Sequence, residues 1–290
     1  PASTALTGGG YVLVWEHYGS RDGDPDEGVT LQHYDASGKL LKETKIVSGE
    51  AEDPSVTATA DGGYFIAWST ESKGTSSVLI QQFDEDGNAT NKAQTVASSK
   101  SAELEDVVVS VLPNGNYVVS WVSAVEKRAS TNDPALDMTD GEMDNRYRDE
   151  TGDLYLQLYG ADGKKIGTAQ KANIETFTNS VPDDQIILPL DGGSFLIAYT
   201  HETATHTWNE DDFGWGFKSS EYHSALYVRE FNADGSAKGA PQLLHTLDTD
   251  YPNASYYSLI KTDDGYLASW VANVDAAPIF GRTLIAQKFN

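Results

Sequence analysis

The stretch GYFIAWSTE, residues Gly63–Glu71, decides the fold because similar stretches recur along the chain. Each copy reads as a strand with an aromatic residue near its end, and Trp15, Trp68 and Trp121 are evenly spaced. The other copies are GYVLVWEHY from Gly10, NYVVSWVSA from Asn116, SFLIAYTHE from Ser194 and GYLASWVAN from Gly265. Recurrence at a near-constant spacing is typical of repeat architectures. We therefore expect five copies of one structural unit.

Each unit holds further strand patterns around this stretch. PSVTATADGG, from Pro54, precedes it, and VLIQQFDEDG, from Val78, follows it. Alternating apolar and polar residues predict strands with one buried face, and the D-G endings supply the left-handed position of a tight hairpin turn. Short apolar runs such as TKIVS, from Thr44, add a fourth strand.

The fold class that follows is all-β. We expect a five-bladed β-propeller of four-stranded antiparallel blades, with the last blade incomplete because the sequence reaches Asn290 on its third strand. A β-sandwich is the alternative, but a sandwich would not predict five copies of one pattern. The repeated aromatics Trp15, Trp68, Trp121 and Trp270 are expected to pack between blades.

The composition limits the kinds of site, partner and cellular location that we expect for the protein. The 290 residues contain no cysteine and carry a formal net charge of −24. Disulfides and thiolate metal sites are thereby excluded, and nucleic acid and anionic membranes would be repelled. No apolar run is long enough to span a membrane. We expect residues 1–290 to form a single domain, secreted or at the cell surface, cut from a larger parent chain with neighbouring domains.

The repeat also resembles a known class of proteins. The pattern G-G-[YF] followed by a Trp, and then Q-x-[YF]-D-x-x-G, resembles the tandem repeats of large secreted bacterial RTX-type adhesins and haemolysin-like surface proteins. The resemblance implies a module that binds a glycan or a protein on a cell surface. The glycine- and aspartate-rich calcium repeats of that class are absent from this sequence.

Two long insertions interrupt the repeat, at residues 123–153 and 201–224. Both follow the aromatic strand of their unit, so we expect both on the same face of neighbouring blades, where long loops commonly carry function. Trp208 and Trp215 match no repeat position and either stack on a sugar ring or form the core of the loop. The predicted ligand-binding residues are Trp208, Trp215, Asp211, Asp212, His206, Tyr222, Tyr147 and Arg146. A metal site built on His201, His206 and His223 is a further alternative, although their spacing matches no zinc motif.

Three acidic residues recur in register with the repeat. Asp53, Asp106 and Asp184 each lie at the same distance before the aromatic residue of their unit. At the mouth of a central channel, three carboxylates could hold a hard cation such as Ca²⁺, or serve as acid and base for glycoside hydrolysis. The alternative is a role in turn geometry, since the neighbouring E-D-P-S and P-D-D-Q sequences also suit turns.

These observations favour a non-catalytic, ligand-binding propeller of an adhesin-like protein, whose partner is a cell-surface glycan or protein. No catalytic residue is assigned on this interpretation, and Ca²⁺ at Asp53, Asp106 and Asp184 is the one expected cofactor. The alternative interpretation is a carbohydrate-active enzyme that uses those carboxylates. A structural spacer without a ligand is the third hypothesis.

Overall fold

The computed structural model describes residues 1–17, 28–128, 148–174, 180–210, 216–249, 257–276 and 279–289. These residues form antiparallel sheets, as predicted, and the one helical element among them is a single 3₁₀ turn, η2 (Asp191–Gly193). In the described ranges no helix has the length and apolar character to cross a membrane. The all-β prediction is confirmed.

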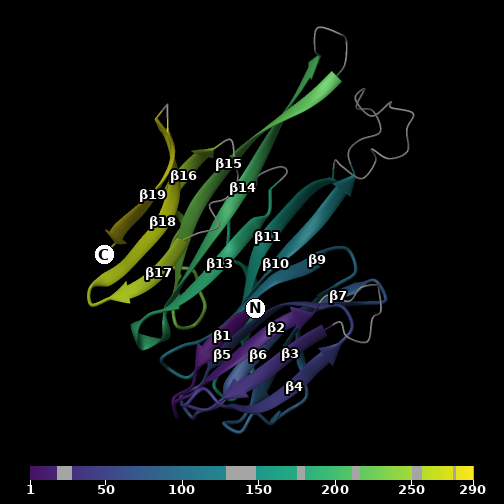
Figure 1. Ribbon diagram of the computed structural model, residues 1–290, viewed down its shortest axis with the longest axis vertical. Coiled ribbons are helices and arrows are strands. Elements are labelled where there is room, and N and C mark those ends of the chain that lie inside the picture. The colour runs from purple at the N-terminus through teal and green to yellow at the C-terminus, as the bar shows by residue number, and fades with distance from the viewer. Residues whose placement is uncertain are drawn as a thin grey trace.

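The first two sheets follow the predicted order of strands (Figure 1). The first sheet contains β1 (Ala2–Ala5), β2 (Tyr11–His17), β3 (Gly28–Tyr34) and β4 (Leu40–Ser48). The second contains β5 (Ala51–Ala58), β6 (Tyr64–Ser72), β7 (Thr75–Phe83) and β8 (Gln94–Ser99).

The remaining described strands form two further four-stranded sheets and one of three strands. The third sheet contains β9 (Glu103–Val111), β10 (Tyr117–Arg128), β11 (Arg148–Tyr159) and β12 (Lys165–Lys171). The fourth contains β13 (Pro182–Pro189), β14 (Phe195–Glu210), β15 (Gly216–Phe231) and β16 (Gln242–Thr249). The fifth contains β17 (Tyr257–Thr262), β18 (Gly265–Ala276) and β19 (Ile279–Phe289).

The core lies between successive sheets. Each sheet presents one aliphatic face, and the next sheet along the chain covers it with an aromatic face. In the second interface, for example, Val78 and Ile80 of the second sheet pack with Tyr117, Trp121 and Tyr159 of the third. Equivalent clusters join the first sheet to the second, the third to the fourth and the fourth to the fifth. In each interface, aromatic side chains of the repeated stretch thus pack against the aliphatic face of the preceding sheet.

The repeated tryptophans confirm this packing, with one difference. Trp68, Trp121 and Trp270 are only 2–3% exposed. Trp15, in the first sheet, is only half-buried, and it does not belong to any of the four buried clusters. Its environment differs because, among the described residues, none of the four cores is built on the aromatic face of the first sheet.

The predicted D-G hairpins are present, as Asp61-Gly62 shows. Gly62 has φ +95°, a left-handed conformation that glycine adopts without a steric penalty. Its N–H donates to the carbonyl of Thr59 at 3.2 Å, and the N–H of Thr59 donates to the carbonyl of Gly63 at 2.8 Å. These bonds close the turn between β5 and β6.

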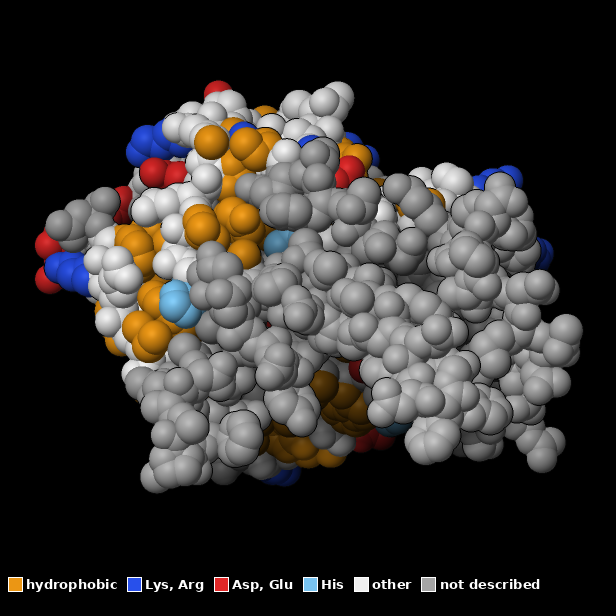
Figure 2. Space-filling view, turned by 90° about the horizontal axis from the view of Figure 1, so that it is seen from above, with side chains coloured by type: hydrophobic (Ala, Val, Ile, Leu, Met, Phe, Trp, Pro, Cys, Tyr) orange, Lys and Arg blue, Asp and Glu red, His pale blue; other side chains and the backbone are white. Residues whose placement is uncertain are grey.

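Both insertions begin and end as strand rather than loop. β10 and β11 stay paired as far as Arg128 and Arg148, and β14 and β15 stay paired as far as Glu210 and Gly216. Figure 1 shows both extended hairpins leaving the body of the molecule in the same direction. On the face seen in Figure 2, the described hydrophobic side chains gather in patches.

We expect the repeated aromatics to contribute unequally to stability. Trp121→Ala removes a fully buried side chain from an inter-sheet core and should lower the free energy of unfolding by about 3–5 kcal/mol. Trp15→Ala, at the half-buried position, should cost about 1 kcal/mol. Urea unfolding of both variants checks this, and equal losses would contradict the difference in packing.

Candidate functional site

Three inner strands carry the same backbone irregularity at the predicted aspartates. In β5, Asp53 and Pro54 together oppose Trp68, because the register jumps from the pair Glu52–Ser69 to the pair Ser55–Ala67. The registers of β9 and β13 jump in the same way at Asp106 and Asp184. Two residues opposite one define a β-bulge, a device that re-aims side chains and is common beside active sites.

The three aspartates share one unusual backbone conformation. Their φ angles are +50° at Asp53, +51° at Asp106 and +52° at Asp184. Non-glycine residues enter this region at a cost of about 1–3 kcal/mol each unless the surroundings hold them there. Aspartate tolerates the region better than most residues, which explains part of its recurrence but not why glycine was avoided three times.

Hydrogen bonds join the bulges of successive sheets. The N–H of Asp53 donates to Glu16 Oε2 at 2.9 Å, and the N–H of Asp106 donates to Asp53 Oδ2 at 2.8 Å. Gln185 Nε2 donates to the carbonyl of Asp106, and the Tyr257 hydroxyl donates to the carbonyl of Asp184. These bonds link all five sheets in series. We call the following residues along this series the carboxylate centre: Glu16, Asp53, Asp106, Asp183 and Asp184, with Tyr257.

Asp106 is the most perturbed carboxyl group of this centre. Burial, a side-chain hydrogen bond with Asp183 and the proximity of Asp183, Asp53 and Glu105 raise the pKa of Asp106 to about 9. All of the charges that raise it are negative, so a proton on Asp106 relieves their mutual repulsion. The hydrogen-bonded pair of Asp106 and Asp183 therefore favours holding a proton.

Asp53 behaves differently from its neighbour. Burial raises the pKa of Asp53, and the N–H of Asp106, by donating to this carboxylate, partly offsets the effect. Glu16 and Asp183 raise the pKa further by charge repulsion. The centre therefore holds two acidic groups whose environments differ, which is the usual arrangement for separate acid and base roles.

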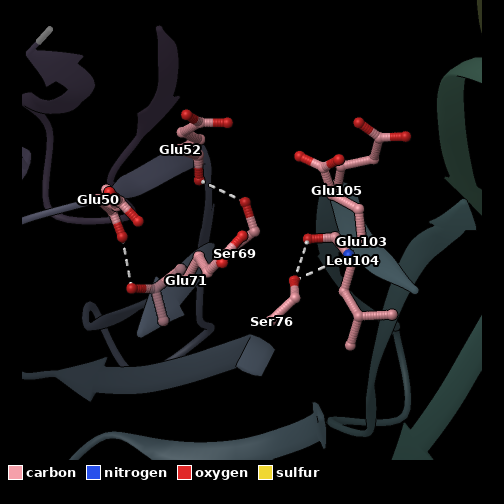
Figure 3. A pocket seen from close by; sticks show the side chains of 9 residues that line it. Glu50, Glu52, Ser69, Glu71, Ser76, Glu103, Leu104 and Glu105 are labelled. Carbon is pink, nitrogen blue, oxygen red and sulfur yellow. Dashed lines mark hydrogen bonds between the residues drawn. The ribbon is translucent and has the colours of Figure 1, made fainter. Parts of the chain in front are cut away.

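An acidic groove of about 320 Å³ lies beside the centre, between the second and third sheets. Figure 3 shows glutamates on its two sides, with Glu50 and Glu52 facing Glu103 and Glu105 across the gap. Glu52 and Glu105 directly precede Asp53 and Asp106, so the groove adjoins the bulges. Ser76 completes its wall by accepting a hydrogen bond from the N–H of Leu104 at 2.9 Å.

The structure brings together only part of what the sequence predicted. Asp53 and Asp106 converge, as expected, but the side chain that reaches Asp106 belongs to Asp183, while Asp184 lies nearer Tyr257. Sequence reasoning missed Glu16, Asp183 and Tyr257. Of these, Asp183 could have been found from the sequence, because an acidic residue precedes each of the three aspartates: Glu52, Glu105 and Asp183.

The predicted ligand-binding residues of the insertions stay a prediction. Trp215, Asp211, Asp212, Tyr147 and Arg146 lie outside the described residues. Trp208 and His206 lie in β14 and Tyr222 lies in β15, where the backbone alone is described. The histidine site on His201, His206 and His223 is untested for the same reason, apart from His201, which is buried and hydrogen-bonded to Ser180.

Comparison with known proteins gives structural matches alone. No protein-family model and no curated protein matches the chain. The α-L-arabinanase of Penicillium chrysogenum, solved with arabinobiose, matches with a TM-score of 0.55 and 12% identity over 99% of this chain and 76% of that one. A levansucrase variant of B. megaterium matches with a TM-score of 0.49 and 10% identity over 99% and 80% of the two chains. The first match supports a propeller-type fold.

The predicted resemblance to RTX-type adhesins is wrong, and with it the interpretation as a cell-adhesion module. No family model supports it, and a structural match with a TM-score above 0.5 is an α-L-arabinanase solved with arabinobiose. The physical reason lies in the motif itself. Its glycines form hairpin turns and its aromatics fill inter-sheet cores, so the pattern reports blade geometry and carries no information about adhesion.

The raised pKa of Asp106 predicts how stability depends on pH. The folded state favours the protonated form, so the contribution of Asp106 to stability is complete below its ordinary pKa of 3.8 and is lost as pH rises toward about 9. Asp106→Asn keeps the shape and removes the charge, so it should melt at a higher temperature than the parent at the alkaline end of this window. Melting curves across the window check this. Asp162→Asn, at an exposed turn whose carboxyl pKa is lowered by Lys164, is the control that should show no such gain.

Proposed function

We propose that this protein is a carbohydrate-active enzyme, a glycoside hydrolase that works at the carboxylate centre. Its five sheets are, on this proposal, the five blades of a propeller, the last one incomplete, arranged around the axis on which the centre lies. The observation that carries the proposal is the hydrogen bond from the Asp106 N–H to Asp53 Oδ2 across two neighbouring sheets, which places a carboxyl group of raised pKa beside a second carboxylate. Glycoside hydrolysis requires two such groups, one to protonate the leaving oxygen and one to act as base or nucleophile.

The roles follow from the two environments. Asp106 is the proton donor, because burial and negative neighbours hold its proton at neutral pH. Asp53 is the base or nucleophile: its pKa is also raised, but the backbone N–H of Asp106 donates to its carboxylate and partly offsets that effect. Asp183 positions and polarises Asp106 through their hydrogen bond.

The surroundings fit a glycan substrate. The acidic groove is lined by carboxylates, including those of Glu52 and Glu105 next in the chain to Asp53 and Asp106, and sugar hydroxyls donate readily to carboxylates. The similarity to an α-L-arabinanase solved with arabinobiose supports arabinose-containing oligosaccharides as the first substrates to test. The strained bulges also fit, because strain in the backbone is commonly held at functional sites.

Activity measurements test the proposal. Asp106→Asn and Asp53→Asn should each lower glycan hydrolysis by about 10²–10⁴-fold, measured as release of reducing sugar from arabino-oligosaccharides and a wider glycan panel. The parent rate should fall at alkaline pH as Asp106 loses its proton. Asp162→Asn is the matched control and should keep the parent rate. A parent protein that hydrolyses none of these glycans, or an Asp106→Asn variant with full activity, would refute the proposal.

Calcium at the predicted aspartates remains a separate proposal. The described residues contain no group of three or more His, Cys, Asp or Glu side chains arranged to hold a metal ion. A cation would nevertheless relieve the same repulsion that a proton relieves. If Ca²⁺ binds there, it should raise the melting temperature more at alkaline than at acidic pH, because protons compete for the carboxylates. The effect should vanish in Asp106→Asn, and an unchanged melting temperature in the parent would exclude the site.

A further inference from the structure

Two positions of the repeat are polar in one interface and apolar in the interface before it. Gln185 is the second residue of the bulge in β13, where β5 has Pro54 and β9 has Val107. Ser120 pairs with the residue that follows the bulge of β9, as Ala67 does for β5. Gln185 is 8% exposed and Ser120 is 0% exposed. A buried polar pair therefore lies between the third and fourth sheets.

Packing alone does not require this polar pair. At the equivalent positions of the second and third sheets, Ala67 and Val107 both belong to the buried apolar core. Replacing both partners of a buried hydrogen bond with apolar groups can be neutral or stabilising. The fold accepts an apolar pair at these positions, so the role of Gln185 and Ser120 has to be sought in what they bind.

The hydrogen bonds of Gln185 lead to the carboxylate centre. Its Nε2 donates to the carbonyl of Asp106, and its Oε1 accepts from the Ser120 hydroxyl. Of the two ends of a glutamine side chain, only the amide nitrogen can donate to a carbonyl. The bond from Ser120 thus holds the amide in the orientation that binds Asp106.

The strand that carries Gln185 also contacts Asp106 through Asp183. Asp183 lies two residues before Gln185 in β13, and its side chain is hydrogen-bonded to the side chain of Asp106. The carbonyl of Asp183 accepts from Thr200 Oγ1 at 3.1 Å, which fixes this residue to β14. The N–H of Asp106 is held separately, by Asp53 Oδ2 at 2.8 Å. β13 is therefore attached to Asp106 at two places, the carbonyl oxygen and the carboxyl group.

We propose that Gln185 is a positioning residue, which holds the carboxyl groups of Asp106 and Asp183 against each other by fixing the Asp106 peptide. Two carboxyl groups repel each other when both are charged, so their contact needs a support that does not depend on their own attraction. The neutral amide of Gln185 supplies it, because its bonds to a carbonyl and a hydroxyl do not depend on the charge of the pair. The catalytic consequence rests on the proposed function, in which Asp106 must be held beside the reacting bond.

A double variant tests this role. Ser120→Ala with Gln185→Val reproduces the apolar pair of the preceding interface, so it should fold, but it no longer holds the Asp106 carbonyl. The side-chain carboxyl carbon-13 signals of Asp106 and Asp183 should then move from their parent positions at neutral pH, while the signal of the exposed Asp162 stays in place. In glycan hydrolysis kcat should fall by about 10–100-fold with KM little changed, because a misplaced catalytic group slows the chemical step without removing substrate contacts.

Gln157→Val is the matched control. Gln157 is also buried, at 1% exposed, and its Nε2 donates to the carbonyls of Leu158 at 2.9 Å and Ile166 at 3.1 Å within the third sheet. This variant should lose stability, but it should keep the parent kcat and the parent signals of Asp106 and Asp183.

Parent signals for Asp106 and Asp183 in the double variant would overturn the proposal, whatever the activity. An equal loss of kcat in Gln157→Val would also overturn it, because the loss would then reflect general loosening of the fold. If the parent hydrolyses no glycan, the proposed function fails, and the carbon-13 signals alone decide whether Gln185 positions the pair. Gln185→Met, which keeps the length of the side chain, replaces the double variant if that variant fails to fold.

Discussion

The hydrogen bonds that pass from bulge to bulge around the carboxylate centre are the interaction on which the rest of the structure depends. The N–H of Asp53 donates to Glu16 of β2, and the N–H of Asp106 donates to Asp53 of β5, so β5 and β9 are each fixed to the preceding sheet at the residue where their backbone is irregular. The inter-sheet cores set the angle between neighbouring sheets, but apolar packing is not directional. The polar links fix the height at which each sheet meets the next, and that is why acidic residues from different sheets arrive at one point.

This arrangement is costly to the folded state. It combines three non-glycine residues at positive φ with carboxyl groups that repel one another. Glycine at these positions would relieve the backbone strain, and asparagine would relieve the charge while keeping much of the hydrogen bonding. That the sequence holds aspartate at all three favours a chemical role over a purely structural one, because strain and repulsion concentrated at one site are characteristic of function retained at the expense of stability.

The sequence predicted those features of the fold that recur in every unit. The five aromatic stretches, the D-G turns and the order of strands are set by short-range geometry, so they could be predicted and were confirmed. The carboxylate centre was only half predictable. Asp53 and Asp106 were identified by their spacing, but Glu16, Asp183 and Tyr257 reach the centre through the arrangement of sheets, which no local pattern encodes. The adhesin interpretation failed because it treated a blade-forming motif as a mark of function.

The same repetition explains why the exposure of Leu284 could not be recognised from the sequence. Leu284 occupies the repeat position of Val29, Val78, Leu154 and Leu226, and all four of those residues are fully buried. By pattern alone Leu284 is a core residue, and only its exposure in the folded chain distinguishes it from them.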